Sequence, residues 1–217
     1  MKYIVMCGGT YDNWSIPRQL SKVNGEVLVA RTIRLLKENG ITDIAISSNN
    51  EVFEQFGVPV LKHKNDFVVG VDNIGDYWVS AFYPIDGPAC YLFGDVFFSD
   101  EAIKTIINTK TDDIEFFASC PPYSEYCAKQ GGEPFAFKVI NQTHFRTSID
   151  RVIELDKLGK WNRHPIAWEL WQVIKETPIN HIDWNNYTAI NDYTCDVDNP
   201  WDISKIEDGV RRWNCQS

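Results

Sequence analysis

The sequence is short of basic residues and has no long hydrophobic run. It contains 21 lysines and arginines against 30 aspartates and glutamates, which gives a formal net charge of −9. Duplex nucleic acid is bound through a basic face, so we expect no nucleic-acid partner. The apolar run at residues 3–7 is far too short for a signal peptide or a membrane span, and no other run is longer than a core strand or helix needs. We therefore expect no membrane association.

The six cysteines also lack the spacing of a zinc site or a redox motif. No two of them form a CxxC pair, and the four histidines form no paired motif. In a chain of 217 residues, an even number of cysteines is more often a set of reduced core thiols than a disulfide framework. We expect a cytoplasmic protein.

Short apolar runs alternate with amphipathic segments through the first half of the chain. We predict strands at 3–7, 44–46, 59–61 and 90–93, and helices at 27–39, 51–56, 75–84 and 101–107. This alternation is typical of βαβ units, so it predicts an α/β fold with a Rossmann-like, mostly parallel sheet and helices on both faces. From about residue 116 the rhythm changes. We predict strands at 116–119 and 135–140, and an aromatic-rich helix at 165–174.

The first motif that could carry chemistry follows the first predicted strand. Gly8, Gly9 and Thr10 come directly after it. Two glycines at this place let backbone amides approach a ligand and surround an anion. Arg18 or Lys22 could then supply a cation that closes over phosphates. The alternative is an ordinary turn with solvated charges, because glycine pairs are common.

The second motif is Gly94-Asp95, at the end of an apolar strand. A carboxylate there is costly to bury unless it is paired or bound to a metal. Asp95 is therefore a candidate ligand for Mg²⁺, which takes one or two carboxylates together with phosphate oxygens. The alternative is that Asp95 caps the following turn.

The third motif lies at residues 195–203, where Asp196 and Asp198 precede Pro200 and Asp202. Two carboxylates two residues apart on a strand lie on the same face, so one of them could join the carboxylate of the second motif on a metal. Pro200 suits the first turn of a last helix. The helix dipole is enough to explain Asp202, but it explains Asp198 less well.

In this order and at these separations, the three motifs resemble the nucleotidyltransferase superfamily, in particular small-molecule cytidylyltransferases and sugar-phosphate nucleotidyltransferases. The family's glycine-rich loop, Pro-Lys-x-Leu and Val-x-Gly read here as Gly8-Gly9-Thr10, Pro17-Arg18-Gln19-Leu20 and Val23-Asn24-Gly25. Its Gly-Asp matches Gly94-Asp95, and its closing Asp-Thr-Pro-Glu-Asp-Leu matches Asp198-Asn199-Pro200-Trp201-Asp202-Ile203. The chain departs from the family in two ways. Arg18 replaces the lysine, and residues 11–16 lack a further glycine and arginine.

The resemblance implies a sheet of the nucleotide-diphospho-sugar transferase type in a single domain, 1–217. Within this domain, 1–115 would form the nucleotide-binding half and 116–190 a small acceptor-binding lobe, where the match to the family is weak. Residues 191–217 would provide the strand that binds the metal and the last helix.

The implied reaction transfers a nucleoside monophosphate from a nucleoside triphosphate to a phosphorylated sugar, polyol or amine, with release of pyrophosphate. The resemblance makes Arg18, Asp95 and Asp198 the catalytic residues, with Mg²⁺ held by Asp95 and Asp198. The residues it implies for nucleotide binding are Gly8, Gly9, Thr10, Arg18, Lys22, Asn73, Asp76, Ser80 and Gly94. We favour CTP because the compact length resembles that of small cytidylyltransferases.

The acceptor would be bound by the second half of the chain. The candidate side chains are those of Lys129, Glu133, Lys138 and Arg163, each of which alone could equally be a surface charge. Trp161, Trp168 and Trp171 could stack on a base or enclose an amine, but aromatic residues at helical spacing are more often core. We also consider a homodimer.

Two other functions compete with this interpretation. A metal-dependent glycosyltransferase of the related nucleotide-sugar-binding fold would use an Asp-x-Asp motif, which is present as Asp196-Val197-Asp198. That motif lies nearer the C-terminus than such enzymes place it, and a glycosyltransferase would release a nucleoside diphosphate. The other alternative is a non-catalytic nucleotide-sensing domain, which would bind a nucleoside triphosphate without producing pyrophosphate.

Overall fold

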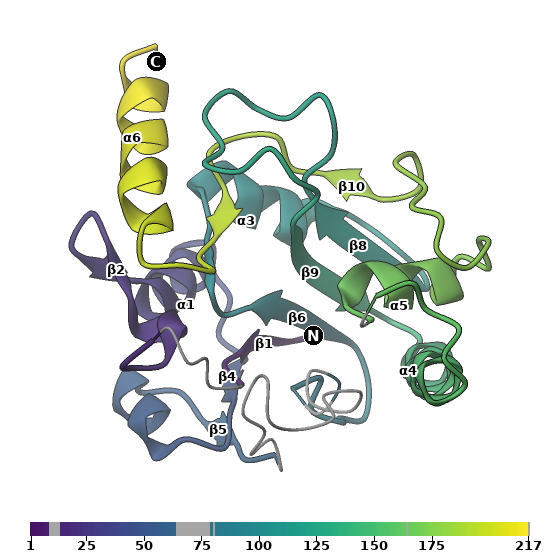
Figure 1. Cartoon of the computed structure of the whole chain (residues 1–217). Helices are drawn as coiled ribbons and strands as arrows, with labels where there is room; N and C mark the ends of the chain where they lie inside the picture. The colour runs from purple at the N-terminus through teal and green to yellow at the C-terminus, as the bar shows by residue number, and fades with distance from the viewer. Residues whose placement is uncertain (9–13, 64–78, 80, 164, 217) are drawn as a thin grey trace.

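A mixed sheet lies at the centre of the molecule in the computed structural model, which describes residues 1–8, 14–63, 79, 81–163 and 165–216 (Figure 1). Within those ranges the sheet has seven strands in the order β10-β8-β9-β6-β1-β4-β5. Their bounds are β1 (Lys2–Met6), β4 (Ile44–Ser47), β5 (Val60–Leu61), β6 (Ala89–Phe93), β8 (Ile114–Ala118), β9 (Pro134–Val139) and β10 (Thr188–Ala189). Strand β9 runs antiparallel to both of its neighbours, and every other pair in the sheet is parallel. The predicted class, a mostly parallel mixed sheet, is confirmed.

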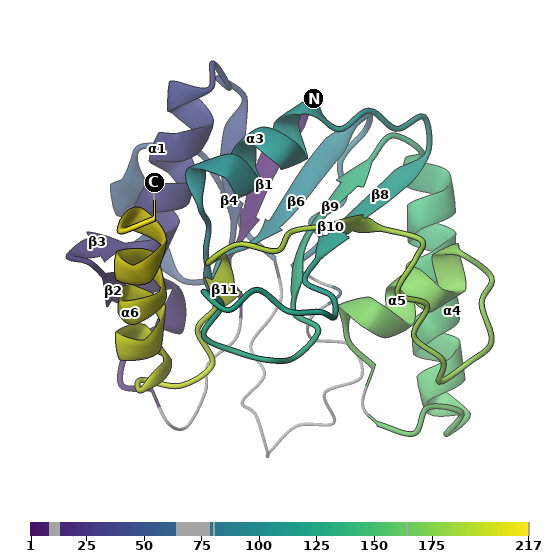
Figure 2. The same cartoon turned by 90° about the horizontal axis from the view of Figure 1, so that it is seen from above.

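Helices cover both faces of the sheet (Figure 2). Side chains alternate along each strand, so apolar residues point to both faces and helices pack against each. In β1, Tyr3 and Val5 belong to one core cluster, whereas Ile4 and Met6 belong to another. Helices α1 (Leu28–Glu38) and α3 (Asp100–Asn108) pack on the first face, and α4 (Gln142–Lys157) and α5 (Ala167–Ile174) pack on the second.

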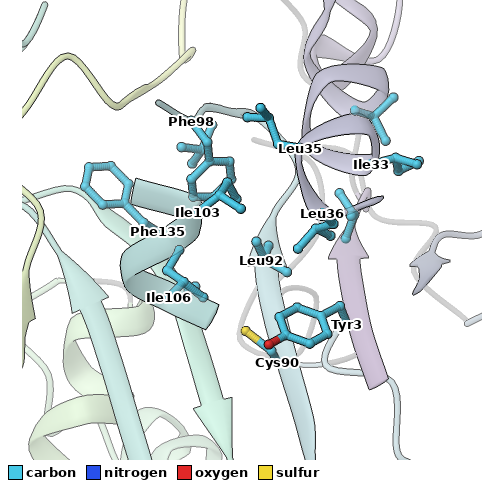
Figure 3. Packing of buried hydrophobic residues seen from close by; sticks show 14 of the residues in the cluster. Tyr3, Ile33, Leu35, Leu36, Cys90, Leu92, Phe98, Ile103, Ile106 and Phe135 are labelled. Carbon is cyan, nitrogen blue, oxygen red and sulfur yellow. The ribbon is translucent and has the colours of Figure 1, made fainter. Parts of the chain in front are cut away.

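Figure 3 shows the packing on the first face. Leu92 of β6 lies between Leu36 of α1 and Ile106 of α3, and all three side chains are fully or almost fully buried. Burying apolar surface contributes roughly 25 cal/mol per Å². This continuous contact therefore fixes both helices on the sheet and holds the strand ends in place.

Local signals set the ends of these helices. The Ser99 hydroxyl accepts a hydrogen bond from the Ala102 amide at 2.8 Å and so caps the start of α3. The Asn141 side chain caps α4 in the same way, accepting from the His144 amide at 3.0 Å. After α1 the chain turns at Gly40, whose φ of +79° suits glycine.

Smaller elements lie beyond the carboxyl ends of the parallel strands. Strands β7 (Val96–Phe97) and β11 (Cys195–Asp196) form an antiparallel pair, and β2 (Lys22–Val23) and β3 (Glu26–Val27) form a second one. The last helix, α6 (Asp202–Asn214), lies beside β2 (Figure 1). Two short 3₁₀ helices, η1 (Arg18–Leu20) and η2 (Glu51–Phe56), complete the described elements.

The structure bears out most of the elements predicted from the sequence. The expected core role of two tryptophans is confirmed, because Trp168 and Trp171 are only 2% and 3% exposed. Helix α4 was not predicted, and neither was β10. The predicted helix at 75–84 falls mainly outside the described residues, and 81–84 are not helical. No described helix is both long enough and apolar enough to cross a membrane.

Candidate active site

A cavity of about 330 Å³ opens beyond the carboxyl ends of β1 and β6. In an open α/β sheet this edge is where ligands bind. Its lining comes from both halves of the chain and combines apolar and charged side chains. The described lining residues are Met6, Gly8, Arg18, Gln19, Ala81, Phe93, Asp95, Glu133, Pro134, Ile166, Ala167, Asp196 and Asp198.

Gly94 allows the acidic end of β6 to approach β1. Its amide donates to the Met6 carbonyl at 2.9 Å. A Cβ at this position would lie 2.4 Å from the Met6 carbonyl oxygen and 2.7 Å from Cys7 Sγ, so only glycine fits without a shift of the backbone. The next residue, Asp95, is 8% exposed and lines the cavity. The close approach of β6 to β1 therefore explains the glycine of the Gly-Asp pair, and the place of Asp95 in the cavity wall explains the aspartate.

Arg18 links the first motif to the other two. Its guanidinium forms an ion pair with Asp95 through Nη2, and its Nη1 lies 2.8 Å from Asp198 Oδ1. The Arg18 side chain is 12% exposed. The next residue, Gln19, donates to the Gly8 carbonyl at 3.3 Å and so holds η1 against the end of β1. One cation therefore contacts both carboxylates that were predicted as metal ligands.

Asp198 is also held by two other segments. Lys129, in the loop between β8 and β9 that passes β11, places its Nζ 2.6 Å from Asp198 Oδ2 and 2.8 Å from Asp196 Oδ1 (Figure 2). The indole Nε1 of Trp14 donates to the Asp198 carbonyl at 2.9 Å. Residues from 14–18, 129 and 196–198 therefore meet at one point, although they are far apart in the sequence.

Carboxylates outnumber cations in this cluster. Burial raises the pKa of Asp196 well above its usual range, and the nearby Glu133 and Asp198 raise it further. Burial likewise raises the pKa of Glu133, against the attraction of Lys129. Burial also opposes a charge on Asp198, but Arg18 and Lys129 outweigh it and lower the pKa of Asp198. The cluster therefore has more carboxylates than cations to pair with them, and an added cation would favour their ionised forms.

The carboxylates fit a hard divalent cation. Within the described ranges, no three or more His, Cys, Asp or Glu side chains are arranged to hold a metal ion by themselves. However, the side chains of Asp95 and Asp198 contact the two terminal nitrogens of one guanidinium, so the two carboxylates lie on either side of one cation. Mg²⁺ keeps several waters and uses one or two carboxylates plus phosphate oxygens. This donor set suits Mg²⁺ bound together with a nucleotide.

The structure brings together the central predicted residues but not all the others. Gly8, Arg18, Gly94, Asp95, Asp198 and Glu133 lie at or beside the cavity, and Lys129 contacts its carboxylates. Lys22 is exposed on β2 and is not part of the lining. Gly9, Thr10, Asn73, Asp76 and Ser80 lie outside the described residues.

Two cations predicted for the acceptor are engaged elsewhere. Lys138 is 5% exposed within β9, and its ammonium donates to the carbonyls of Ile106, Ile107 and Thr109 at the end of α3, at 2.9, 2.9 and 2.6 Å. Arg163 Nε lies 2.7 Å from Glu169 Oε1 at the start of α5. The structure therefore places Lys138 and Arg163 in structural contacts and not in the cavity lining.

Sequence reasoning missed several residues of the site. Ile166 and Ala167 line the cavity from the start of α5, and Trp14 holds Asp198. Trp14 stands six residues after Gly8, within the stretch 11–16 that lacks the further glycine and arginine of the resembled family. A tryptophan in a loop that follows a glycine pair was the available signal.

Comparison with known proteins rests on structure, since no protein-family model and no curated protein matches the sequence. The inositol-1-phosphate CTP transferase from T. maritima matches with a TM-score of 0.56 and 17% identity over 96% of both chains. The CTP:phosphocholine cytidylyltransferase from Streptococcus pneumoniae matches with a TM-score of 0.51 and 16% identity, over 96% of this chain and 98% of that one. A putative glucose-1-phosphate thymidylyltransferase from Bacillus anthracis matches with a TM-score of 0.55 and 14% identity, over 97% and 95%. The chain has the nucleotidyltransferase superfamily fold.

The similarity extends over nearly the full length of each matched structure, so it concerns the whole nucleotidyltransferase fold and not one βαβ unit. It includes the antiparallel β9 and the elements beyond it, where the sequence resemblance was weak. The central sheet and its helices agree with the nucleotide-diphospho-sugar transferase type expected from the sequence.

Proposed function

We propose that this chain is a Mg²⁺-dependent nucleotidyltransferase. It transfers a nucleoside monophosphate, CMP in the favoured case, from the triphosphate to a phosphorylated small molecule and releases pyrophosphate. The observation that carries the proposal is the contact of Asp95 and Asp198 with one cation at the carboxyl edge of this fold. The two residues are 103 positions apart, and a purely structural ion pair would not require them to line a cavity.

In the proposed reaction, a phosphate oxygen of the acceptor attacks the α-phosphorus of the nucleotide. A new P–O bond forms, the bond to the bridging oxygen breaks, and pyrophosphate leaves with that electron pair. The protein contributes positioning and charge neutralisation and no covalent step. Asp95 and Asp198 would hold Mg²⁺, which would neutralise charge on the α-phosphate when bound.

Arg18 and the glycine loop would act on the departing phosphates. Arg18 is the cation among the described residues that line the cavity, and Gly8 also lines the cavity. We propose that the first half of the chain, 1–115, binds the triphosphate and that 116–190 bind the acceptor. Two of the similar structures are CTP-dependent enzymes, and this supports CTP as the favoured donor.

A pyrophosphate-release screen tests the proposal. Each of the four ribonucleoside triphosphates is combined with phosphorylated sugars, polyols and amines, with and without Mg²⁺. We expect pyrophosphate only when donor, acceptor and metal are all present, and none from the Asp95→Asn variant. Release of a nucleoside diphosphate, or binding of a triphosphate without any pyrophosphate, would contradict the proposal.

A further inference from the structure

The part of the cavity formed by the second half of the chain is lined by carboxylates and apolar side chains. Glu133 and Pro134 come from the start of β9, and Ile166 and Ala167 from the start of α5. Asp196, from β11, adds a second carboxylate nearby. These five described lining residues include no cation.

The cations that could neutralise this wall are committed to other groups. Lys138 and Arg163 bond to the end of α3 and to Glu169, as described above. Lys129 Nζ lies 2.6 and 2.8 Å from the carboxylates of Asp198 and Asp196 but 3.9 Å from Glu133 Oε1. That last separation is longer than a hydrogen bond. Glu133 therefore has Lys129 at ion-pair distance, but none of these three cations lies within hydrogen-bond distance of its carboxylate.

The carboxylates and apolar side chains of this wall suit an amine acceptor better than a sugar or polyol. A sugar or polyol presents several hydroxyls, each of which loses free energy if it is buried without a hydrogen-bond partner. An ammonium on a short carbon chain needs a carboxylate for its charge and apolar contacts for its methylenes. Glu133 supplies the first, and Pro134, Ile166 and Ala167 supply the second.

The size of the cavity agrees with a small acceptor. Its volume of about 330 Å³ is near the lower end of the range for small-molecule sites, roughly 300–1,000 Å³. The same space must also hold the phosphates of the nucleotide beside Arg18 and Asp95. A compact acceptor therefore suits this volume better than a bulky one.

We propose that the acceptor is the phosphate ester of a short amino alcohol, and that Glu133 selects it by pairing with the ammonium. This inference rests on the proposed function, because it places the acceptor's phosphate at the α-phosphorus of the bound nucleotide. The products would be the nucleoside diphosphate ester of the amino alcohol and pyrophosphate. Glu133 is then a residue that determines specificity and does not take part in bond making.

The test compares two acceptors of nearly equal size, 2-aminoethyl phosphate and 2-hydroxyethyl phosphate. Their binding is measured by calorimetry with a non-hydrolysable CTP analogue and Mg²⁺ present, and their turnover by pyrophosphate release. A hydrogen-bonded charge pair of this kind should favour the amine by about ten- to a hundredfold in Kd. Glu133→Gln should remove most of that preference by weakening the amine, while the affinity for the hydroxyl compound changes little.

Glu125→Gln is the matched control, because Glu125 is an exposed carboxylate of the same loop. It should keep the preference. Equal binding of the two compounds by the wild-type protein, or a preference that survives Glu133→Gln, would overturn the inference whether or not turnover is seen. Tight amine binding without pyrophosphate release would instead contradict the proposed function. Release of pyrophosphate with sugar phosphates but not with the amine would leave the function standing and overturn the acceptor class.

Discussion

Among the residues that the structure describes, Arg18 is the side chain that contacts both candidate metal ligands, and its replacement removes these contacts. Its guanidinium bonds to Asp95 through one terminal nitrogen and to Asp198 through the other. Arg18→Ala therefore leaves the two carboxylates facing each other with the cation between them gone. Asp95 is the more affected, since its side chain is 12% exposed, whereas that of Asp198 is 46% exposed and still contacts Lys129.

The effect on the reaction should exceed the effect on the fold. Negative charge grows on the departing pyrophosphate, so a cation there acts more strongly in the transition state than in the ground state. Groups of this kind contribute on the order of a hundred- to a thousandfold in rate, and Arg18→Ala should lower kcat by about that factor. Leaving Asp95 without this partner should lower the free energy of unfolding by about 1–3 kcal/mol. Arg18→Lys should recover part of the rate, because it restores the charge but not the planar fork.

The assay is steady-state pyrophosphate release with the triphosphate varied, together with thermal melts of each variant. Lys22→Ala is the matched control, since Lys22 is an exposed cation four residues along the chain. It should leave kcat and KM unchanged. If Arg18→Ala has the kcat and KM of the wild type, Arg18 does not face the phosphates and its contacts with the carboxylates are structural only.

Three further substitutions test neighbouring parts of the site. Asp95→Asn should abolish Mg²⁺-dependent turnover with a melting temperature near that of the wild type, and Asp198→Asn should do the same; activity within a few-fold of wild type would remove that carboxylate from the metal site. Gly94→Ala should destabilise the fold by about 1–3 kcal/mol in denaturant titration, because its Cβ would meet the Met6 carbonyl at 2.4 Å. Lys138→Met should also destabilise the protein, by about 1.5–3 kcal/mol, because three carbonyls lose a charged donor. It should leave the acceptor's KM unchanged, and a raised KM with normal stability would return Lys138 to the acceptor site.

The fold could be predicted from the sequence because its strands are short, apolar and separated by helices. Periodicity was also present in the one long helix that was missed. In α4, Phe145, Ile149 and Val152 are buried at helical spacing, and Asn141 caps the start. The polar residues between them hid this pattern. The strand β10 has only two residues, too few for any alternation to be recognised.

The position of the site was predictable from strand ends, whereas the partners of individual cations were harder to predict. Asp95 follows β6 at the carboxyl edge of the sheet, and Asp198 follows β11, which pairs with β7 directly after Asp95, so their meeting follows from topology. The direction of Lys138 follows from alternation in β9, which places Phe137 and Val139 on the face opposite α3. Arg163 was not predictable, because its pairing with Glu169 depends on the path of the chain into α5.

The substitution of arginine for the family's lysine has a physical explanation in this geometry. A lysine ammonium is a compact charge on a flexible chain, whereas a guanidinium presents two terminal nitrogens in one plane. Here those nitrogens meet carboxylates that come from two different strand ends, one nitrogen to each. Lys129 supplies the point charge, at 2.6 and 2.8 Å from the other side of the same cluster. Arg18 and Lys129 together stabilise a cluster rich in carboxylates. Under the proposed function, a bound Mg²⁺ would replace the guanidinium at these carboxylates, and Arg18 would then be available to the phosphates.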